Sequence, residues 1–319
     1  MNSKETLGAA LVRPVPASPS FLTEASPVKG IFWMFVTGLC FVAVTALVKA
    51  LGTGVPPAQS AFLRYLLGLV FLLPVWRILV QHRGERRDWL LFAGRGVVHA
   101  LGVILWFFAM TQIPLAEVTA MNYLSPVYVT ILAALFLGEK LAARRIAAVV
   151  FALVGAAIIL RPGFREVSPG HIAMFFAAMV FGGSYILAKV LADEVNAAVV
   201  VSMLSIWVTA GLAPFAWAVW VTPTWTEIGI LFGVACFATA GHYTMTLAFA
   251  AAPMTVTQPV TFLQLVWATA LGAIVFNEAV DIWVVFGGSL ILSSVTFITW
   301  REAVLKRRAI TPPTPATKV

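Results

Sequence analysis

Residues 114–139 read PLAEVTAMNYLSPVYVTILAALFLGE, and residues 253–278 read PMTVTQPVTFLQLVWATALGAIVFNE. Both stretches begin with proline and end with glutamate, and they lie 139 residues apart. The same offset places Gly102 on Gly241. Matching proline, glycine and glutamate positions at one fixed offset indicate an internal repeat.

The composition around these stretches is that of a membrane protein. Of the 319 residues, 61% are hydrophobic and 11% are charged, and the mean hydropathy is +0.96. A soluble domain has about 45–50% apolar and about 25% charged residues. Several runs approach the ~20 apolar residues that cross a ~30 Å hydrocarbon layer as a helix. We therefore expect a polytopic α-helical membrane protein.

Charge clusters, prolines and glycines divide the chain into ten expected membrane spans. They lie near residues 30–50, 58–80, 89–111, 116–137, 143–161, 170–190, 197–220, 226–250, 254–275 and 282–301. The expected fold class is thus an all-α integral membrane protein with ten transmembrane helices. An even number of spans places both termini on the same side of the membrane.

The distribution of Lys and Arg predicts which side that is. Sixteen of these residues fall in the tails and loops on the side of the termini and three on the other side, while Arg64 and Arg95 fall within spans. Cytoplasmic loops carry an excess of Lys and Arg. We therefore expect cytoplasmic termini in a multi-pass protein of the cytoplasmic (inner) membrane. Short basic loops also account for the net charge of +8 without a nucleic-acid partner.

Each copy of the repeat holds five spans, and an odd number turns the second copy upside down. We expect a disordered cytoplasmic tail at 1–28, repeats at 29–165 and 166–301, and a basic cytoplasmic tail at 302–319. Inverted repeats are typical of secondary transporters, whose substrate site lies near the membrane midplane between the halves.

A polar stripe occurs in the fourth span and again in the ninth. Its members recur every three residues and correspond at the repeat offset: Thr119, Asn122 and Ser125 in the first copy, and Gln258, Thr261 and Gln264 in the second. Residues at this spacing share a helix face, so we expect the stripe to line a substrate cavity. Hydrogen bonding between helices is the alternative explanation. Pro126 lies on the stripe and its counterpart is Leu265, so any kink there should be asymmetric.

A second stripe lies along the third span, where Arg95, His99 and Trp106 are at i, i+4 and i+11. Ionisable groups within a membrane usually face a bundle interior or a water-filled cavity, which makes these residues and Arg64 cavity candidates. The alternatives are that Arg64 and Arg95 snorkel to headgroups and that His99 only packs.

Other residues are weaker candidates. Tyr123, Tyr185, His242 and Trp267 are further candidates for the cavity lining. Glu117 and His99 are candidates for proton coupling, although a carboxylate at a helix start is also favourable without any such role.

The stretches LAEVTAMNYLSPVYVTILAALFLGEKL and RIAAVVFALVGAAIILRPG, with the echo MTVTQPVTFLQLVWATALGAIVFNEAV, resemble the EamA-type ten-helix branch of the drug/metabolite transporter superfamily. The resemblance covers about residues 30–301. It implies two inverted five-helix repeats, alternating access, a cavity formed by helices 1–4 and 6–9, and peripheral helices 5 and 10. The family's helix-ending Gly-Glu maps onto Gly138-Glu139, whereas the second copy has Asn277-Glu278.

The leading functional hypothesis is a secondary-active transporter for a small polar metabolite, such as an amino acid or a nucleoside-like or vitamin-like solute. An intramembrane enzyme is the first alternative, but the chain has no HExxH or GxSxG motif and only four histidines. A membrane sensor or scaffold is the second, and it would call for a sizeable soluble domain. We expect no cofactor and no metal. The expected partners are the small-molecule substrate and the lipid bilayer, with a homodimer as an option. The sequence leaves open the substrate, the direction of transport and the coupling ion.

Overall fold

The computed structural model describes residues 26–136, 142–164, 166–192, 195, 197–252 and 254–310. Ten helical stretches in this part of the chain are long and apolar enough to cross a membrane, and each agrees with a predicted span to within a few residues. The prediction of an all-α protein with ten spans is confirmed, and the chain is a multi-pass membrane protein.

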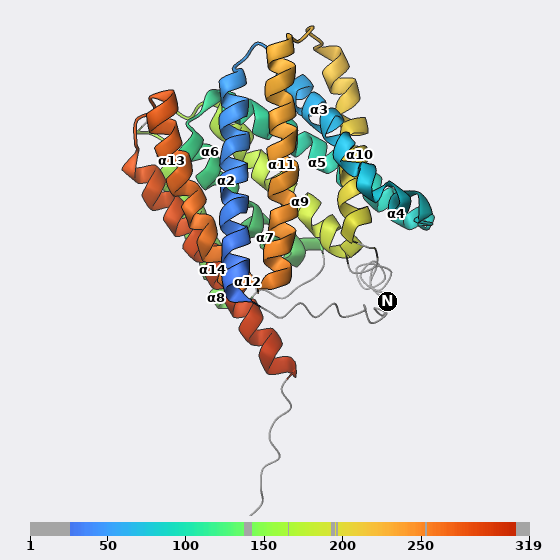
Figure 1. Ribbon diagram of the computed structural model, residues 1–319. Helices are drawn as coiled ribbons and strands as arrows, with labels where there is room; N and C mark the ends of the chain where they lie inside the picture. Colours follow the sequence, from blue (N-terminus) through green and yellow to red (C-terminus); the bar gives the residue numbers. More distant parts are fainter. Residues whose placement is uncertain are drawn as a thin grey trace, which may run out of the picture.

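The helices of the first copy run alternately up and down the bundle (Figure 1). They are α2 (Pro27–Leu51), α3 (Pro57–Gly68) continued by η1 (Leu69–Val75) and α4 (Trp76–Gln81), α5 (Arg86–Gln112), α6 (Leu115–Asn122) with α7 (Ser125–Phe136), and α8 (Ala143–Leu160). Those of the second copy are α9 (Pro169–Ala192), α10 (Ala197–Ala218), α11 (Trp225–Ala251), α12 (Met254–Thr257) with η2 (Gln258–Thr261) and α13 (Phe262–Phe276), and α14 (Ile282–Ile310).

The helix boundaries repeat at the offset that the sequence indicates. Helices α5 and α11 begin and end 139 residues apart, and each starts with a capping box, Glu85 with Asp88 in one and Thr224 with Glu227 in the other. Such a box satisfies two backbone N–H groups that the helix leaves free. The helix start is therefore encoded in the same way in both copies.

Helix packing follows the symmetry of the repeat. Helix α2 packs along α11 and α5 along α9, and these are equivalent pairs when the two copies are exchanged. Helix α3 packs on α10 and α8 on α14, and each of these pairs joins a helix to its own counterpart. Glycines allow the closest approach: Gly155 and Gly287 face each other where α8 crosses α14, and a Cβ on either would collide with the other's carbonyl oxygen. The two inverted five-helix repeats are therefore interlocked around a pseudo-twofold axis.

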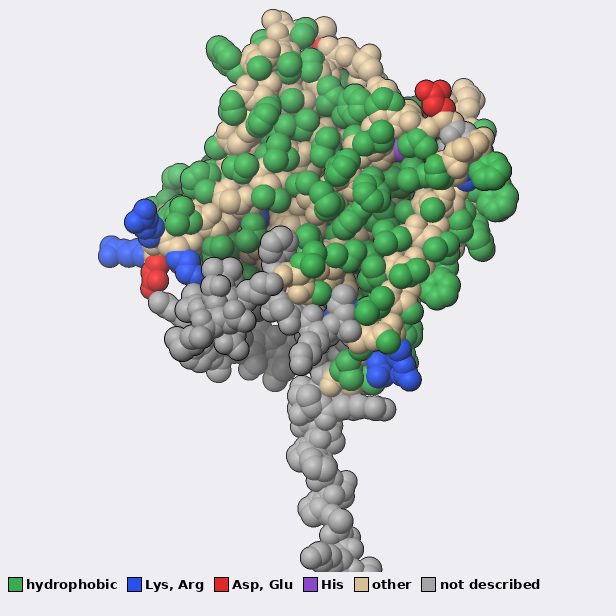
Figure 2. Space-filling model, turned by 180° about the vertical axis from the view of Figure 1, so that it is seen from behind, with side chains coloured by type: hydrophobic (Ala, Val, Ile, Leu, Met, Phe, Trp, Pro, Cys, Tyr) green, Lys and Arg blue, Asp and Glu red, His purple; other side chains and the backbone are tan. Residues whose placement is uncertain are grey.

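The beginning of α2 and the end of α14 lie at the same end of the bundle (Figure 1). The opposite end, which carries Lys49, Glu117, Arg161 and Glu278 and which the charge count predicts to be extracellular, is called the outer end below. Figure 2 shows a face covered mainly by hydrophobic side chains, with most of its Lys and Arg side chains toward the end where the chain begins and finishes.

Two expectations about helix shape are corrected. Helix α14 continues to Ile310 rather than stopping at residue 301, so it includes the first residues of the predicted basic tail. Both copies of the polar stretch are interrupted: α6 gives way to α7 at residues 123–124, and the 3₁₀ turn η2 contains Pro259. The asymmetry expected from Pro126 is therefore one of position: the second copy is also interrupted at a proline, but Pro259 lies six residues before Leu265, the counterpart of Pro126.

Candidate functional site

The polar stripe of α5 faces the second repeat rather than lipid. Arg95 and His99 are each 6% exposed. The ring centroid of Phe181 on α9 is 5.0 Å from that of His99 and 6.3 Å from that of Trp106. Gly102 lies between them, and a Cβ there would be 2.8 Å from the Phe181 ring. The missing side chain thus lets Phe181 lie against α5 at the level between His99 and Trp106.

Both nitrogens of the buried His99 ring have hydroxyl partners. The His99 Nδ1 atom is 3.0 Å from Ser184 Oγ of α9, and Nε2 is 3.1 Å from Tyr65 Oη of α3. Ser184 is 0% exposed and Tyr65 is 7% exposed. A neutral imidazole has one donor and one acceptor nitrogen, so this pair of hydroxyls satisfies it and fixes its orientation. His99 therefore ties α3, α5 and α9 together near the middle of the bundle.

The two arginines predicted from the sequence lie inside the bundle. Arg95 donates from Nη1 to the carbonyl oxygen of Val200 on α10, at 3.1 Å. The Arg64 guanidinium carbon lies 3.9 Å from the centroid of the Tyr65 ring, which is cation–π geometry. Both arginines are less than 8% exposed. Neither side chain reaches the surface of the protein in the way that snorkelling requires.

Several polar atoms on α5, α6 and α7 are buried without a hydrogen-bond partner. Among the residues that the structure describes, they include Arg95 Nε, Trp106 Nε1, Asn122 Oδ1, Ser125 Oγ and Tyr128 Oη. A buried polar group without a partner costs about 1–3 kcal/mol, and such groups are uncommon in native structures. Tyr128, on α7, was not among the predicted site residues. These groups are available to a bound solute.

Tyr185 on α9 continues the row of aromatic rings next to His99. Tyr185 stacks on Phe181 with an interplanar angle of 25°, and its hydroxyl is within electrostatic range of Arg95 and Tyr65. Nevertheless Tyr185 is 43% exposed. His242 on α11 is half-buried and lies within electrostatic range of both arginines.

The mirrored stripe lies at the interruptions of the fourth and ninth spans. Thr119 is buried, and its hydroxyl donates to the Leu115 carbonyl one turn earlier. Tyr123 donates from Oη to the carbonyl oxygen of Thr261, at 2.7 Å, and so joins the two interrupted helices. Gln264 is half-buried, with its Cβ next to Gly38 of α2. The prediction that the stripe belongs to the solute site remains a prediction.

The candidate Trp267 lies apart from this cluster. Trp267 is 38% exposed and packs edge-on against Phe35, with ring centroids 6.3 Å apart. The side chain of Gln258 lies outside the described part of the chain.

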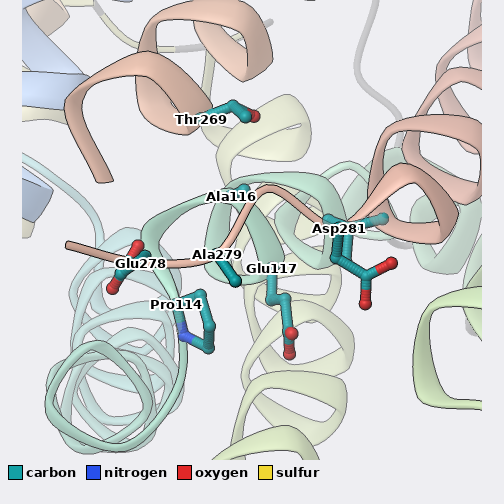
Figure 3. A pocket seen from close by; sticks show the side chains of 8 residues that line it. Pro114, Ala116, Glu117, Thr269, Glu278, Ala279 and Asp281 are labelled. Atoms are coloured by element: carbon teal, nitrogen blue, oxygen red, sulfur yellow. The ribbon is translucent and has the colours of Figure 1, made fainter. Parts of the chain in front are cut away.

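The outer end contains two ion pairs and one carboxylate–histidine contact, and all three join the two repeats. Lys49 pairs with Glu278, Arg161 with Asp281, and Glu117 on α6 with His171 on α9. The Lys49 ammonium also donates to the Ile113 carbonyl oxygen at 3.0 Å, and Glu278 accepts from the Leu115 amide at 3.0 Å. Figure 3 shows Glu117 beside the loop that carries Glu278 and Asp281. The pocket between them has a volume of about 10 Å³, room for about one water molecule.

Glu117 and His99, the two candidates for proton coupling, are in separate networks. Glu117 and His171 are 3% and 5% exposed, and Ser168 completes this network through a 2.8 Å hydrogen bond to His171 Nδ1. No sequence pattern indicates this contact, because 54 positions separate Glu117 from His171.

A wider groove, of about 690 Å³, lies between η2, α13 and α14. It is lined by Pro259, Phe262, Ser289, Leu292, Ser293, Thr296, Phe297 and Trp300. None of the sequence-predicted candidates lines it. Within the described residues, no three His, Cys, Asp or Glu side chains are grouped so that they could hold a metal ion.

The family that matches this chain and the relatives named below are all transporters. Residues 28–161 match the EamA-like transporter family. The chain is 26% identical over 288 residues to the S-adenosylmethionine uptake transporter of Rickettsia prowazekii (strain Madrid E), with 86% of this chain and 93% of that protein covered. It is 27% identical to the riboflavin transporter of Rhizobium johnstonii, with 88% and 94% covered. It is 24% identical to the pseudopaline exporter of Pseudomonas aeruginosa (strain UCBPP-PA14), with 83% and 93% covered.

The fold is similar to that of a solved crystal structure. That chain superimposes in full on 90% of this one with a TM-score of 0.58, at 18% sequence identity. At this identity the similarity concerns the fold alone.

Proposed function

We propose that this chain, a member of the EamA-like transporter family within the drug/metabolite transporter superfamily, is a secondary-active transporter that moves a small polar metabolite across the cytoplasmic membrane by alternating access. The family and the named relatives are transporters, not enzymes. The observation that carries the proposal is a buried polar cluster on α3, α5 and α9, at the junction of two inverted repeats.

The position of the cluster supports alternating access. Solute sites of transporters built from inverted repeats lie near the midplane at the repeat junction, next to interrupted helices. Here His99 is the central residue of the 27-residue helix α5, and both spans that carry the mirrored stripe are interrupted. Each repeat could rock against the other about this level.

The arrangement of charges supports a state closed toward the outside. The three contacts of the outer end all join one repeat to the other, so an outward-facing state requires them to separate. We propose the orientation with both termini in the cytoplasm, which follows from the Lys and Arg distribution. The relatives include both an uptake transporter and an exporter, so the direction of net transport follows from the coupling rather than from the fold.

Proton coupling is part of the proposal and rests on the Glu117–His171 pair. A carboxylate and an imidazole that join the two repeats can exchange a proton as the repeats separate, which would link protonation to the conformational change. Transport measured with and without an imposed pH gradient tests this coupling.

The test is an unbiased metabolite comparison followed by transport in a defined system. Cells that produce the full-length chain are compared with cells that produce the Asn122→Leu variant at equal membrane abundance. Solutes whose cellular or extracellular level differs are then assayed for uptake into sealed proteoliposomes. We expect saturable, protein-dependent accumulation of at least one metabolite. If no solute differs and the vesicles accumulate nothing above protein-free controls, the proposal is wrong.

A further inference from the structure

The charges of this chain are unevenly distributed with depth in the membrane. In the part of the chain that the structure describes, every Asp and Glu lies outside the spans or within three residues of the end of a span. Arg64 and Arg95 lie seven and nine residues inside their spans. At 1.5 Å per residue these positions are about 10 Å and about 13 Å along the helix. Among the described residues, the part of the spans more than three residues from either end therefore contains the guanidinium groups of Arg64 and Arg95 deep in the membrane and no carboxylate.

Neither arginine is neutralised by its neighbours. Among the described residues, Arg64 has no hydrogen bond and no ion pair, and its recorded contact is the face of the Tyr65 ring. Arg95 uses one N–H on a backbone carbonyl, and its Nε–H is buried without a partner. The guanidinium group remains charged at any physiological pH. Charged groups within a membrane are costly and almost always paired, and these two are not.

The buried polar groups without a partner on α5 and α7 can mostly donate hydrogen bonds. Trp106 Nε1 and Arg95 Nε can only donate, and the hydroxyls of Ser125 and Tyr128 can donate. Tyr185 stacks on Phe181, which in turn contacts the ring of His99. A ligand that suits these donors and the two guanidinium groups presents several acceptor oxygens and a negative charge.

We propose that Arg64 and Arg95 form an oxyanion subsite that binds a carboxylate or phosphate group of the transported solute. This inference rests on the proposed transport function and names the solute class: a small metabolite that carries at least one such group. Arginine suits the role because its planar fork matches the two oxygens of a carboxylate or phosphate. His99 acts as a positioning residue, because it holds the Tyr65 ring against which Arg64 lies.

The first experiment measures anion binding without transport. The purified full-length chain in neutral detergent is unfolded by heat in sodium phosphate, in sodium acetate and in sodium chloride at equal ionic strength. We expect phosphate or acetate to raise the melting temperature above that in chloride by ~2–4 °C, because a ligand that binds only the folded state stabilises it. Arg64→Gln and Arg95→Gln should abolish the rise. Arg83→Gln, which removes the same charge from an exposed loop, should retain it.

The outcomes separate the subsite from nonspecific charge effects and from lipid. Equal melting temperatures in all three salts, or an equal loss of the rise in Arg64→Gln and Arg83→Gln, would overturn the proposal. Phosphatidylglycerol added to the micelles is the third arm. If only this lipid stabilises the protein, and Arg64→Gln removes that gain, the arginines hold a lipid headgroup and the proposal is also wrong.

The second experiment identifies the solute class and tests the two proposals separately. Solutes that depend on the chain in the metabolite comparison should carry a carboxylate or phosphate, and their transport should fall about 100-fold in Arg64→Gln. A transported solute without either group would refute the oxyanion subsite and leave the transport function standing. Phosphate stabilisation that depends on Arg64, in a protein that transports nothing, would support the anion site and refute the transport function.

Discussion

The outer end and the centre of this bundle both contain buried or half-buried basic side chains, and they differ in what faces those side chains. At the outer end Lys49 faces Glu278 and Arg161 faces Asp281, so each base meets an acid from the other repeat. In the centre Arg64 faces an aromatic ring and Arg95 a backbone carbonyl. The same type of charge is thus paired in one region and left available in the other.

This difference separates a contact that stabilises one conformation from a site that receives a ligand. Breaking a buried ion pair leaves an uncompensated charge and is destabilising. A buried charge that has no partner is already a cost to the folded state, and such costs are found at functional sites. Removing a base should therefore affect mainly stability and conformation at the outer end, and mainly transport in the centre.

The largest expected effect is the loss of transport in Arg64→Gln. Two charge-assisted hydrogen bonds of about 1.5 kcal/mol each amount to about 3 kcal/mol, or about 100-fold in transport. We expect the melting temperature of this variant to stay equal to that of the wild type or to rise, since the change removes an unpaired buried charge. Uptake into proteoliposomes and thermal unfolding in parallel provide the check. A variant that unfolds at a clearly lower temperature would show that Arg64 stabilises the fold instead.

The next effect concerns the Lys49–Glu278 pair. Lys49→Met and Glu278→Gln should each lower the melting temperature, and the double variant should lose less than the sum of the two. We expect a coupling of about 1 kcal/mol, because the two side chains are 20% and 12% exposed and water weakens the attraction. A double-mutant cycle of unfolding free energies measures it. If the effects of the two substitutions on the unfolding free energy are strictly additive, the Lys49–Glu278 pair does not help to hold the repeats together.

The fold was predictable because its signals are local in the sequence. Each span is a continuous apolar run, and capping residues recur at the repeat offset, as at Glu85 and Thr224. Pro259 indicates the interruption of the second polar stretch in the sequence itself. The expectation of asymmetry considered only Pro126 and therefore missed it. Boundaries and repeats can be read in this way because no contact between distant residues is needed to define them.

The site was predictable only in part. Spacing along the sequence shows which side chains share a helix face, but it does not show which residues of other helices they contact. The spacing of Arg95, His99 and Trp106 indicates a shared face, and the structure turns that face toward α9. The partner Ser184 is 85 positions from His99, and no periodicity in the sequence links them. The unpartnered hydroxyl of Tyr128 is likewise a property of packing, because any tyrosine in a span could have found a neighbour.

A smaller effect, on coupling rather than on rate, is expected from Glu117→Gln. If the Glu117–His171 pair carries the proton, this variant should lose accumulation driven by an imposed pH gradient while it still exchanges labelled for unlabelled solute. The two assays on the same proteoliposomes distinguish coupling from binding. Accumulation that still follows the pH gradient would place the proton elsewhere, and gradient-independent transport by the wild type would reject proton coupling altogether.

The smallest expected effect is that of Ser184→Ala, which removes one of the two hydroxyls that hold His99. The lost hydrogen bond is worth about 1 kcal/mol, so the apparent KM should rise about fivefold, while the maximal rate stays close to that of the wild type. Ser205→Ala on α10 is the matched control, because the Ser205 hydroxyl bonds only its own helix at an exposed position. In this variant the His99 ring keeps its contact with Tyr65 at Nε2. Arg64 should therefore be less well positioned but should still bind the solute. An unchanged KM in Ser184→Ala would mean that the position of His99 does not govern the arginine, and the centre would then have to be described as Arg64 and Arg95 alone.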